Sequence, residues 1–425
     1  MDIQKLLVKI QKGELDNRLL DIYVDKKTLD YQRERYINAI KQFEMYYGLE
    51  DVVIFSAPGR SEIGGNHTDH QHGKVLAGSI NLDTIGIVKA TEDNKIRIKS
   101  DGYDEIIVSL KDIDIKAEEK ETTTALVKGV VTGFIERGFL VGGLCAYITS
   151  DVLIGAGLSS SAAFETLIGT ILSGLYNNMS ISATEIAMIG QYAENTYFGK
   201  PCGLMDQMAC SIGNFVYIDF ENPKEPKVKK VDVDMETYGY SLCITDTKGS
   251  HADLTEEYAS IPNEMKLVAN YFKKEVLRDV SKEDLLENIN MLRDLVGDRC
   301  ILRALHFINE NERVEKEVTA LEEGKFETFL QYIKASGNSS FQYLQNVYSN
   351  HDIKNQNISI ALMLSDMTLD TNGVSRVHGG GFAGTIQAFV KTEFVEVYKK
   401  QMDKVFGNGA CKDLKIRKYG GIKVV

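Results

Sequence analysis

Nine residues, Gly155-Ala156-Gly157-Leu158-Ser159-Ser160-Ser161-Ala162-Ala163, decide the fold and stand between two regular elements. The apolar run before them, LCAYITSDVLI at 144–154, predicts a strand, and the pattern after them predicts a helix through about Tyr176. Glycine lets backbone amides approach an anion, a helix N-terminus carries partial positive charge, and serine hydroxyls bind phosphate oxygens or a metal ion. The stretch therefore indicates a phosphate-binding loop without the Walker lysine or, alternatively, a serine-capped helix start.

The pattern around this stretch predicts an α+β protein with two closely packed lobes that meet near 200–230. Charge-spaced Leu and Ile predict helices within 2–48, and a threonine cap predicts another helix over 122–137. The run VVIFSA predicts a buried strand over 52–57 that ends in a turn at Pro58-Gly59. The other expected elements are strands at 83–90, 95–108, 215–220, 241–247, 384–391 and the end of the chain, and helices after Ile186 and across 256–350.

Composition and charge exclude several classes of protein. With 425 residues, 43% of them hydrophobic and 26% charged, the chain can bury a large core and is not globally disordered. A net charge of −12 supplies no basic field for nucleic acid. The six cysteines include no C-x-x-C pair, which disfavours a disulfide framework or a zinc module.

The distribution of apolar residues predicts the compartment. No uninterrupted apolar stretch reaches the roughly 18 residues that a membrane span needs. Lys, Asp and Gln break each short apolar run at the start of the chain, so we expect no secretion signal. We therefore expect a cytoplasmic protein with reduced thiols and with neither a nucleic-acid nor a membrane partner. These patterns do not specify an oligomeric state.

Polar side chains gather directly after VVIFSA, in the glycine-rich segment APGRSEIGGNHTDH at 57–70. Such a segment offers the donors and acceptors that the hydroxyls of a sugar need. One alternative is a solvated loop. Another is a His/Asp metal site, although the spacing of the His and Asp residues from His67 to His72 does not place them on one face of a helix or strand.

Two further segments carry chemically informative residues. PCGLMDQM at 201–208 places one carboxylate, Asp206, in an uncharged stretch, where it is either a helix cap or a base whose surroundings set its pKa. Glu194, on the preceding helix pattern, is either a second acid for a metal or a surface residue. HGGGFAG at 378–384 permits close backbone approach to a phosphate or sugar, or forms a simple hairpin loop.

In this order and at these intervals, the three loops resemble the signature motifs of the GHMP small-molecule kinases. RSEIGGNHTD at 60–69 is similar to the sugar loop of the galactokinases within that family, GAGLSSSAA resembles the ATP-phosphate loop, and HGGGFAG resembles the glycine-rich third motif. PCGLMDQ resembles the segment with the catalytic aspartate, and ITDTKGSHADLTEEY at 244–258 the segment with a sugar-contacting tyrosine. The resemblance implies the two-lobed GHMP kinase fold, with mixed β-sheets packed against helices and the active site in the cleft between the lobes.

The resemblance also implies boundaries and roles for residues of this chain. The first lobe, 1–215, would contain the sugar and ATP-phosphate loops, and the second, 216–425, would be helix-rich and contain the third motif, with the last strand returning to the first lobe. Asp206 would act as a base or orienting acceptor beside Arg60. The implied sugar contacts are Asn66, His67, Asp69, Gly203, Tyr258 and Gly380, with Gly381 closing over them. ATP would be held by Gly155, Gly157, Leu158, Ser159, Ser160 and Ser161, and Mg²⁺ by Ser161 and Glu194.

Two departures from the galactokinase pattern concern the sugar. Galactokinases usually read E-H-T-D-Y where this chain has Asn66-His67-Thr68-Asp69-His70, and V-N-L-I where it has Ser61-Glu62-Ile63-Gly64. An amide keeps one acceptor but adds two donors, and the loss of a charge at position 66 would admit an N-acetyl or carboxylate group.

The resemblance thus implies an ATP-dependent sugar 1-kinase, with D-galactose as the leading substrate. The alternatives are a kinase for N-acetylgalactosamine, arabinose or a uronic acid, and a non-catalytic sensor of sugar and ATP. The intact run from Ser159 to Ala163, together with Asp206 and Arg60, disfavours the sensor.

Overall fold

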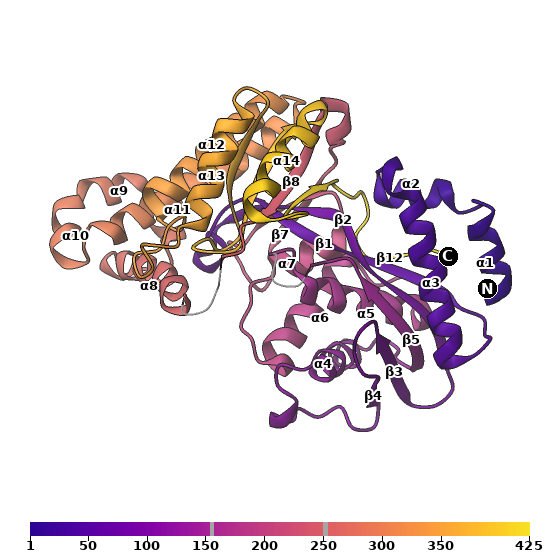
Figure 1. Cartoon of the computed structure of the whole chain (residues 1–425). Coiled ribbons are helices and arrows are strands. Elements are labelled where there is room, and N and C mark those ends of the chain that lie inside the picture. Colours follow the sequence, from indigo (N-terminus) through magenta and orange to yellow (C-terminus); the bar gives the residue numbers. More distant parts are fainter. Residues whose placement is uncertain (154–156, 250–253) are drawn as a thin grey trace.

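Two β-sheets organise the protein, whose computed structural model describes residues 1–153, 157–249 and 254–425 (Figure 1). The larger sheet has eight strands in the order β12-β1-β2-β5-β3-β4, with β6 paired to β2 and β7 to β6. These strands are β1 Val53–Gly64, β2 Lys74–Thr91, β3 Lys95–Ser100, β4 Ile106–Ser109, β5 Gly143–Ser150, β6 Phe215–Asp219, β7 Lys227–Val231 and β12 Ile422–Lys423. Within it, β3 and β5 are parallel and the other paired strands are antiparallel.

The smaller sheet has four strands in the order β11-β8-β10-β9, and all its pairs are antiparallel. Its strands are β8 Tyr240–Asp246, β9 Gly373–His378, β10 Thr385–Lys391 and β11 Cys411–Leu414. Side chains of both sheets share one hydrophobic core, in which Ile63 and Leu76 from the larger sheet join Leu242 and Phe389 from the smaller. The two sheets are therefore packed together.

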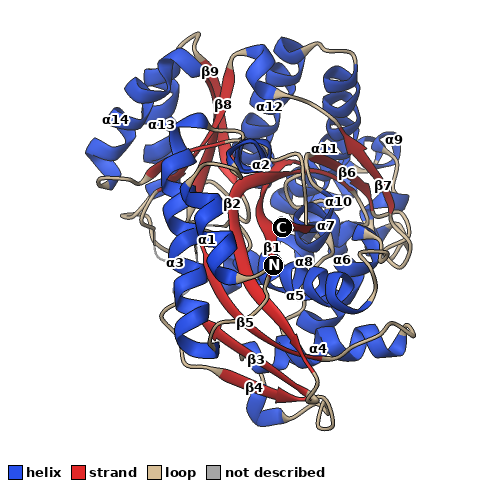
Figure 2. Cartoon of the chain, turned by 90° about the vertical axis from the view of Figure 1, so that its right-hand side faces the viewer, coloured by secondary structure: helices blue, strands red, loops and turns tan. Residues whose placement is uncertain are grey.

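Helices cover both faces of the larger sheet. One face carries α1 Ile3–Gln11, α2 Asp16–Tyr23 and α3 Leu29–Tyr47, and the other α4 Thr123–Glu136, α5 Ser160–Tyr176, α6 Ala183–Tyr192 and α7 Met205–Ile212 (Figure 2). Successive strand residues point to opposite faces, so Ile54 packs among the first helices while Phe55 packs against the second set. Burial on both faces explains why VVIFSA contains a single polar residue, Ser56.

Helices from the second half of the chain lie beside the smaller sheet or extend away from it (Figure 1). They are α8 Thr255–Tyr271, α9 Lys282–Glu287, α10 Ile289–Leu295, α11 Asp298–Glu322, α12 Phe326–Ser339, α13 Asn357–Leu369 and α14 Val395–Phe406. The predicted helical region over 256–350 is confirmed by α8 to α12. In the parts of the chain that the structure describes, no helix is both long and apolar enough to cross a membrane.

Most predicted elements are confirmed, but the turn at Pro58-Gly59 is wrong. The first strand continues through these residues to Gly64, with shifts in its pairing to β2 between Pro58 and Arg60 and again between Glu62 and Gly64. Proline is tolerated because β12 pairs only with Phe55 and Ser56, which leaves the strand at an edge and irregular beyond them. The continuation carries Arg60 directly from the sheet into the site.

Strand β9, of sequence GVSRVH, was not predicted, because its polar residues hide the strand pattern. The threonine cap of α4 is confirmed, since the Thr122 hydroxyl accepts a hydrogen bond from Ala125 N at 3.2 Å. Strands β6 and β7 pair with each other in antiparallel fashion, within the region where the two lobes were expected to meet.

Candidate active site

An ion pair joins the second half of β1 to the start of α7. Arg60 Nε donates to Asp206 Oδ1 and Arg60 Nη2 donates to Asp206 Oδ2, each at 2.7 Å. The Arg60 side chain is 11% exposed and that of Asp206 is 30% exposed, so the pair lies at the wall of an accessible site. Leu204 occupies the N-cap position of α7, so Asp206 is not the helix cap.

The start of α5 contacts the same pair. Arg60 N donates to Leu158 O at 3.0 Å, and Arg60 Nη1 donates to Gly157 O. Ser159 stands at the N-cap position with a φ of 58°, but its side chain does not cap the helix; the hydroxyl donates to Asp206 Oδ2 at 2.7 Å. The serine-cap alternative is therefore wrong for Ser159. Gly155, predicted to bind ATP, lies outside the described residues.

The surroundings of Asp206 keep its carboxylate ionised. Burial raises its pKa, but the nearby Arg60 charge and the hydrogen bonds from Arg60 and Ser159 outweigh burial and hold the pKa below its ordinary value. An ionised carboxylate beside the phosphate loop can orient a hydroxyl or accept its proton.

A second cluster of oxygen atoms includes Ser161, in the first turn of α5. Ser161 Oγ donates to Glu194 Oε1 at 3.2 Å, and Gln207 Nε2 donates to Glu194 Oε2 at 2.8 Å. Burial, and then the Glu194 charge, raise the pKa of neighbouring Glu165 well above its usual value. One hydroxyl and one carboxylate fit Mg²⁺, which binds through few protein oxygens together with substrate phosphates. Among the described residues, no three His, Cys, Asp or Glu side chains are grouped to hold a metal.

The predicted sugar loop lies against the segment before α7. Gly203 approaches Asp69 so closely that a Cβ there would lie 2.7 Å from Asp69 Oδ2. His67 has a φ of 57°, and its Nε2 lies 2.9 Å from Gly380 O. Burial, and then the neighbouring His70, lower the pKa of His67, so its ring is neutral. The structure thus brings His67, Asp69, Gly203 and Gly380 together.

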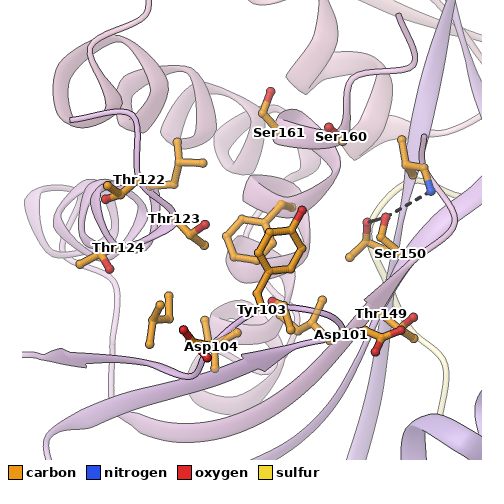
Figure 3. A pocket seen from close by; sticks show the side chains of 18 of the residues that line it. Asp101, Tyr103, Asp104, Thr122, Thr123, Thr124, Thr149, Ser150, Ser160 and Ser161 are labelled. Atoms are coloured by element: carbon orange, nitrogen blue, oxygen red, sulfur yellow. Dashed lines mark hydrogen bonds between the residues drawn. The ribbon is translucent and has the colours of Figure 1, made fainter. Parts of the chain in front are cut away.

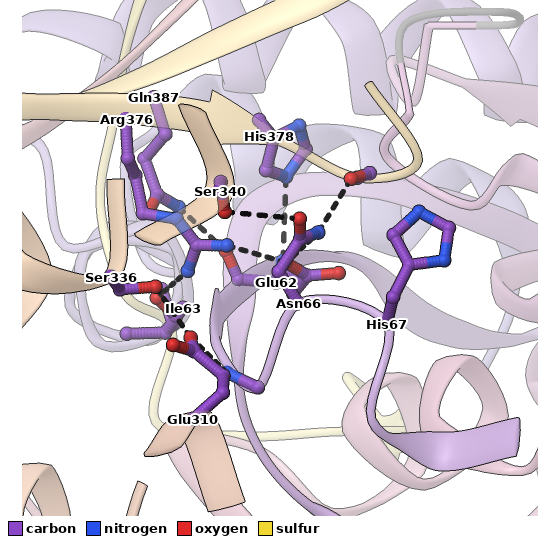
Figure 4. Close-up of polar contacts among 12 residues, drawn as sticks. Glu62, Ile63, Asn66, His67, Glu310, Ser336, Ser340, Arg376, His378 and Gln387 are labelled. Carbon is purple, nitrogen blue, oxygen red and sulfur yellow. Dashed lines mark hydrogen bonds and ion pairs between the residues drawn. The ribbon is translucent and has the colours of Figure 1, made fainter. Parts of the chain in front are cut away.

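Asn66 is enclosed rather than open to the site. Its side-chain Nδ2 donates to Glu62 Oε1 at 3.0 Å and to Gly379 O at 2.7 Å (Figure 4). Its Oδ1 accepts from Asn346 at 2.8 Å and from Ser340 at 3.3 Å. The residue is 0% exposed, so protein groups occupy the amide that the sequence assigns to the sugar.

The glycine-rich motif closes this side of the site. Tyr258, on α8, donates from its hydroxyl to Gly381 O at 2.8 Å. A Cβ on Gly380 would lie 2.6 Å from Tyr258 Cε1, which explains why a residue without a side chain stands there. These contacts bring the predicted tyrosine to the predicted motif from a distant part of the chain.

His378 is a site residue that was assigned no role from the sequence. Its Nε2 lies 3.1 Å from Ser61 Oγ and its Nδ1 lies 2.8 Å from Thr385 Oγ1. Burial, followed by the charges of Arg60 and Arg376, lowers its pKa to about 3, so the ring is neutral. His378 therefore ties the third motif to the strand that carries Arg60. Its place at the head of HGGG was the available signal.

A cavity of about 1010 Å³ lies beside the start of α5. Figure 3 shows Ser160 and Ser161 at one side, the threonines that begin α4 at another, and Tyr103 pointing inward. Most of the wall is apolar, including Ile98, Leu126, Ile148, Val152, Leu153, Phe164 and Phe198. An apolar cavity that opens at a phosphate loop suits the base and ribose of a nucleotide. The apolar residues of this cavity were not identified from the sequence, because they come from many separate segments.

Comparisons with known proteins agree with this geometry. The family model described as the galactokinase galactose-binding signature matches residues 41–90, and that of the GHMP kinase N-terminal domain matches residues 125–214. The galactokinase of Glaesserella parasuis serovar 5 is 32% identical over 364 residues, covering 84% of this chain and 90% of that protein. The galactokinase of Clostridium tetani is 28% identical over 367 residues, covering 85% and 90%.

Solved structures share the fold. The crystal structure of Lactococcus lactis galactokinase complexed with galactose matches with a TM-score of 0.74 at 24% identity, covering 90% of this chain and 98% of that one. A mevalonate kinase matches with a TM-score of 0.60 at 15% identity, covering 86% and 99%. The predicted GHMP kinase fold is confirmed, and the chain belongs to the galactokinase family.

Proposed function

We propose that the protein transfers the γ-phosphoryl group of ATP to the anomeric hydroxyl of D-galactose, forming galactose 1-phosphate and ADP. The observation that carries the proposal is the position of Asp206. Its carboxylate is held by Arg60 from the sugar-loop strand and by Ser159 from the phosphate loop, where a sugar hydroxyl and a phosphate would meet. Galactose is favoured because the galactose-binding signature matches residues 41–90.

Asp206 orients the anomeric hydroxyl and receives its proton as the oxygen bonds to phosphorus. The bond between the γ-phosphorus and the bridging oxygen breaks, and its electron pair leaves with ADP. Arg60 compensates the negative charge that surrounds the transferring group. Phosphoryl transfer needs mainly in-line positioning and charge stabilisation, so these groups are sufficient without a covalent intermediate on the protein.

The remaining polar groups divide between the two substrates. The sugar hydroxyls are bound by His67, Asp69, Gly203, Tyr258 and the backbone at Gly380. The sugar loop contacts the glycine-rich motif through His67 and the segment before Asp206 through Asp69, and Tyr258 contacts the same motif. Gly155 and the run from Gly157 to Ser161 bind the phosphates of ATP, and the adjoining cavity binds its nucleoside.

Ser161 and Glu194 would hold Mg²⁺, whose charge neutralises the phosphate oxygens when it is bound. Lys200 Nζ, 3.7 Å from Glu194 Oε1, keeps this carboxylate compensated before the ion binds.

The lobe boundary and the cytoplasmic location remain predictions. The lobes were predicted to divide at 215/216, and the pairing of β6 and β7 with the larger sheet favours a division some residues later. The cytoplasmic location stands on the sequence alone.

The test is ATP-dependent formation of sugar 1-phosphate by the purified protein with Mg²⁺, across galactose, N-acetylgalactosamine, arabinose, glucuronate and glucose. We expect turnover on galactose that Asp206→Asn abolishes. Asp219→Asn, which removes a carboxylate paired with Arg278 outside the site, is the matched control and should retain turnover in its folded fraction. Turnover on another sugar alone would replace galactose as the substrate, and sugar or ATP binding without turnover would favour the sensor.

A further inference from the structure

Glu62 and Asn66 form a pair within the sugar loop. Glu62 lies near the end of β1 and Asn66 lies just beyond it, four positions further along, and Asn66 Nδ2 donates to Glu62 Oε1 at 3.0 Å. The same carboxylate oxygen accepts from Arg376 Nη2 at 2.8 Å, and Arg376 Nη1 donates to Ile63 O. Two donors from different elements therefore fix the orientation of the Glu62 carboxylate.

Glu62 and Asn66 differ in which of their side-chain atoms remain free to contact a substrate. The polar atoms of the Asn66 side chain are bound by protein groups and the residue is 0% exposed. The Glu62 side chain keeps 7% exposure, and its Oε2 accepts no hydrogen bond from the described residues. Figure 4 shows the Glu62 carboxylate between Asn66 and the side of the site that holds His67. The negative charge of Glu62 acts to raise the pKa of both Arg60 and His67. Glu62 therefore lies near the Arg60–Asp206 pair and near His67 of the sugar loop.

Arg376 is a buried cation that forms an ion pair with Glu62, at 2.8 Å. Arg376 is 0% exposed, and the other nearby acid, Glu317, is also enclosed. Burial raises the pKa of Glu317 to about 8, so that Glu317 is mostly protonated at neutral pH. Glu62 is thus the carboxylate that pairs with Arg376, through Oε1, while Oε2 accepts no hydrogen bond from the described residues.

We propose that Glu62, with Asn66 as its positioning residue, supplies the carboxylate that binds a hydroxyl of the sugar substrate and sets the choice of sugar. The proposal rests on the proposed function. It also joins two departures noted in the sequence, since glutamate stands at the asparagine position of V-N-L-I and asparagine at the glutamate position of E-H-T-D-Y. The negative charge has moved by four residues and has not been lost.

This placement changes the expected specificity. A carboxylate whose Oε1 is saturated by two donors offers Oε2 as a charge-assisted acceptor for one hydroxyl. It repels a carboxylate on the substrate, so uronic acids are excluded, contrary to the sequence-based expectation that position 66 would admit them. The substrate class is a neutral monosaccharide with a hydroxyl at the Glu62 contact.

The experiment compares kcat/KM for galactose and for its 2-, 3-, 4- and 6-deoxy analogues. We expect Glu62→Gln to lower kcat/KM for galactose by about 30-fold, mainly through KM, because a hydrogen bond to a charged group is lost. The one analogue that lacks the bound hydroxyl should change by less than about threefold between wild type and variant, since it makes no contact with Glu62. The exchange variant, Glu62→Asn with Asn66→Glu, should recover at least part of the galactose activity.

Glu310→Gln is the matched control. Glu310 is 0% exposed and its Oε1 accepts from Gly65 N at 3.2 Å, so it supports the same loop from the protein side. This variant should affect galactose and the deoxy analogues by the same factor. A Glu62→Gln effect that is equally uniform, or smaller than threefold on galactose, overturns the proposal.

Failure of the proposed function would be a separate result. If the wild type phosphorylates none of these sugars, the kinase assignment fails, and calorimetric binding of the same sugars to wild type and Glu62→Gln then tests the Glu62 contact. Selective loss of galactose affinity in the variant supports that contact, and equal affinities for every sugar overturn it.

Discussion

Replacing Arg60 with methionine should alter both the rate and its dependence on pH. The change removes the guanidinium but keeps an unbranched side chain of similar length. Asp206 then keeps its burial, which raises the pKa, and loses the charge and hydrogen bonds that lower it. The pKa of Asp206 should therefore rise, and protonation in mildly acidic solution should remove the acceptor for the sugar hydroxyl.

The structure sets the size of the rate loss. Arg60 makes two hydrogen bonds of 2.7 Å to Asp206, and a hydrogen bond to a charged group contributes about 1.5–3 kcal/mol. The Asp206 side chain is 30% exposed, so we take the low end for each and expect a loss of about 3 kcal/mol. This corresponds to a decrease of roughly 150-fold in kcat/KM at neutral pH.

The assay is kcat/KM for galactose between about pH 5 and 9. The lowered pKa of Asp206 in the wild type means that its carboxylate stays ionised over this range, so Asp206 should contribute no acid limb. In Arg60→Met, kcat/KM should fall as the pH decreases, because the raised pKa of Asp206 brings its protonation into the measured range. Arg278→Met, which breaks another two-point Arg–Asp pair, should leave the pH profile unchanged. An Arg60→Met profile that matches the wild type in shape would refute the reasoning.

Three other perturbations test separate parts of the structure. Asp83→Asn should lower the free energy of unfolding by about 3–5 kcal/mol in urea titrations, because two buried arginines lose their shared counter-ion; a loss below about 1 kcal/mol contradicts this. Gly380→Ala should raise KM for the sugar more than KM for ATP, since the added Cβ meets Tyr258 at 2.6 Å, and equal changes would argue against a sugar-side role. Ser161→Ala and Glu194→Gln should each raise the Mg²⁺ concentration for half-maximal activity by about tenfold, and unchanged metal dependence would remove them as ligands.

Sequence predicts well those elements whose pattern reflects a local physical cause. The threonine cap, the helix after the phosphate loop and the strand VVIFSA each follow from capping or from burial, and each is present. The extension of the first strand beyond Pro58 could not be predicted, because it depends on how few residues β12 pairs with. That pairing joins segments more than 360 residues apart.

The candidate site shows the same division. Arg60 was expected beside Asp206 and does hydrogen-bond to it, and Ser159, which was expected at the phosphates of ATP, donates to the same carboxylate. The enclosure of Asn66 was not predictable, because its partners Asn346 and Ser340 come from the distant helical region. The composition of the loop indicated which polar groups were present, whereas tertiary packing determined which of them are enclosed by other protein groups.

The most direct test of the account is to identify the product by NMR after incubating wild-type protein with galactose, ATP and Mg²⁺. The account predicts one sugar phosphate, with phosphorus bonded to the anomeric oxygen, formed in equal amount to ADP and absent with Asp206→Asn. Phosphate on another hydroxyl, or ADP formed without any sugar phosphate, would contradict the central claim that Asp206 presents the anomeric hydroxyl to ATP.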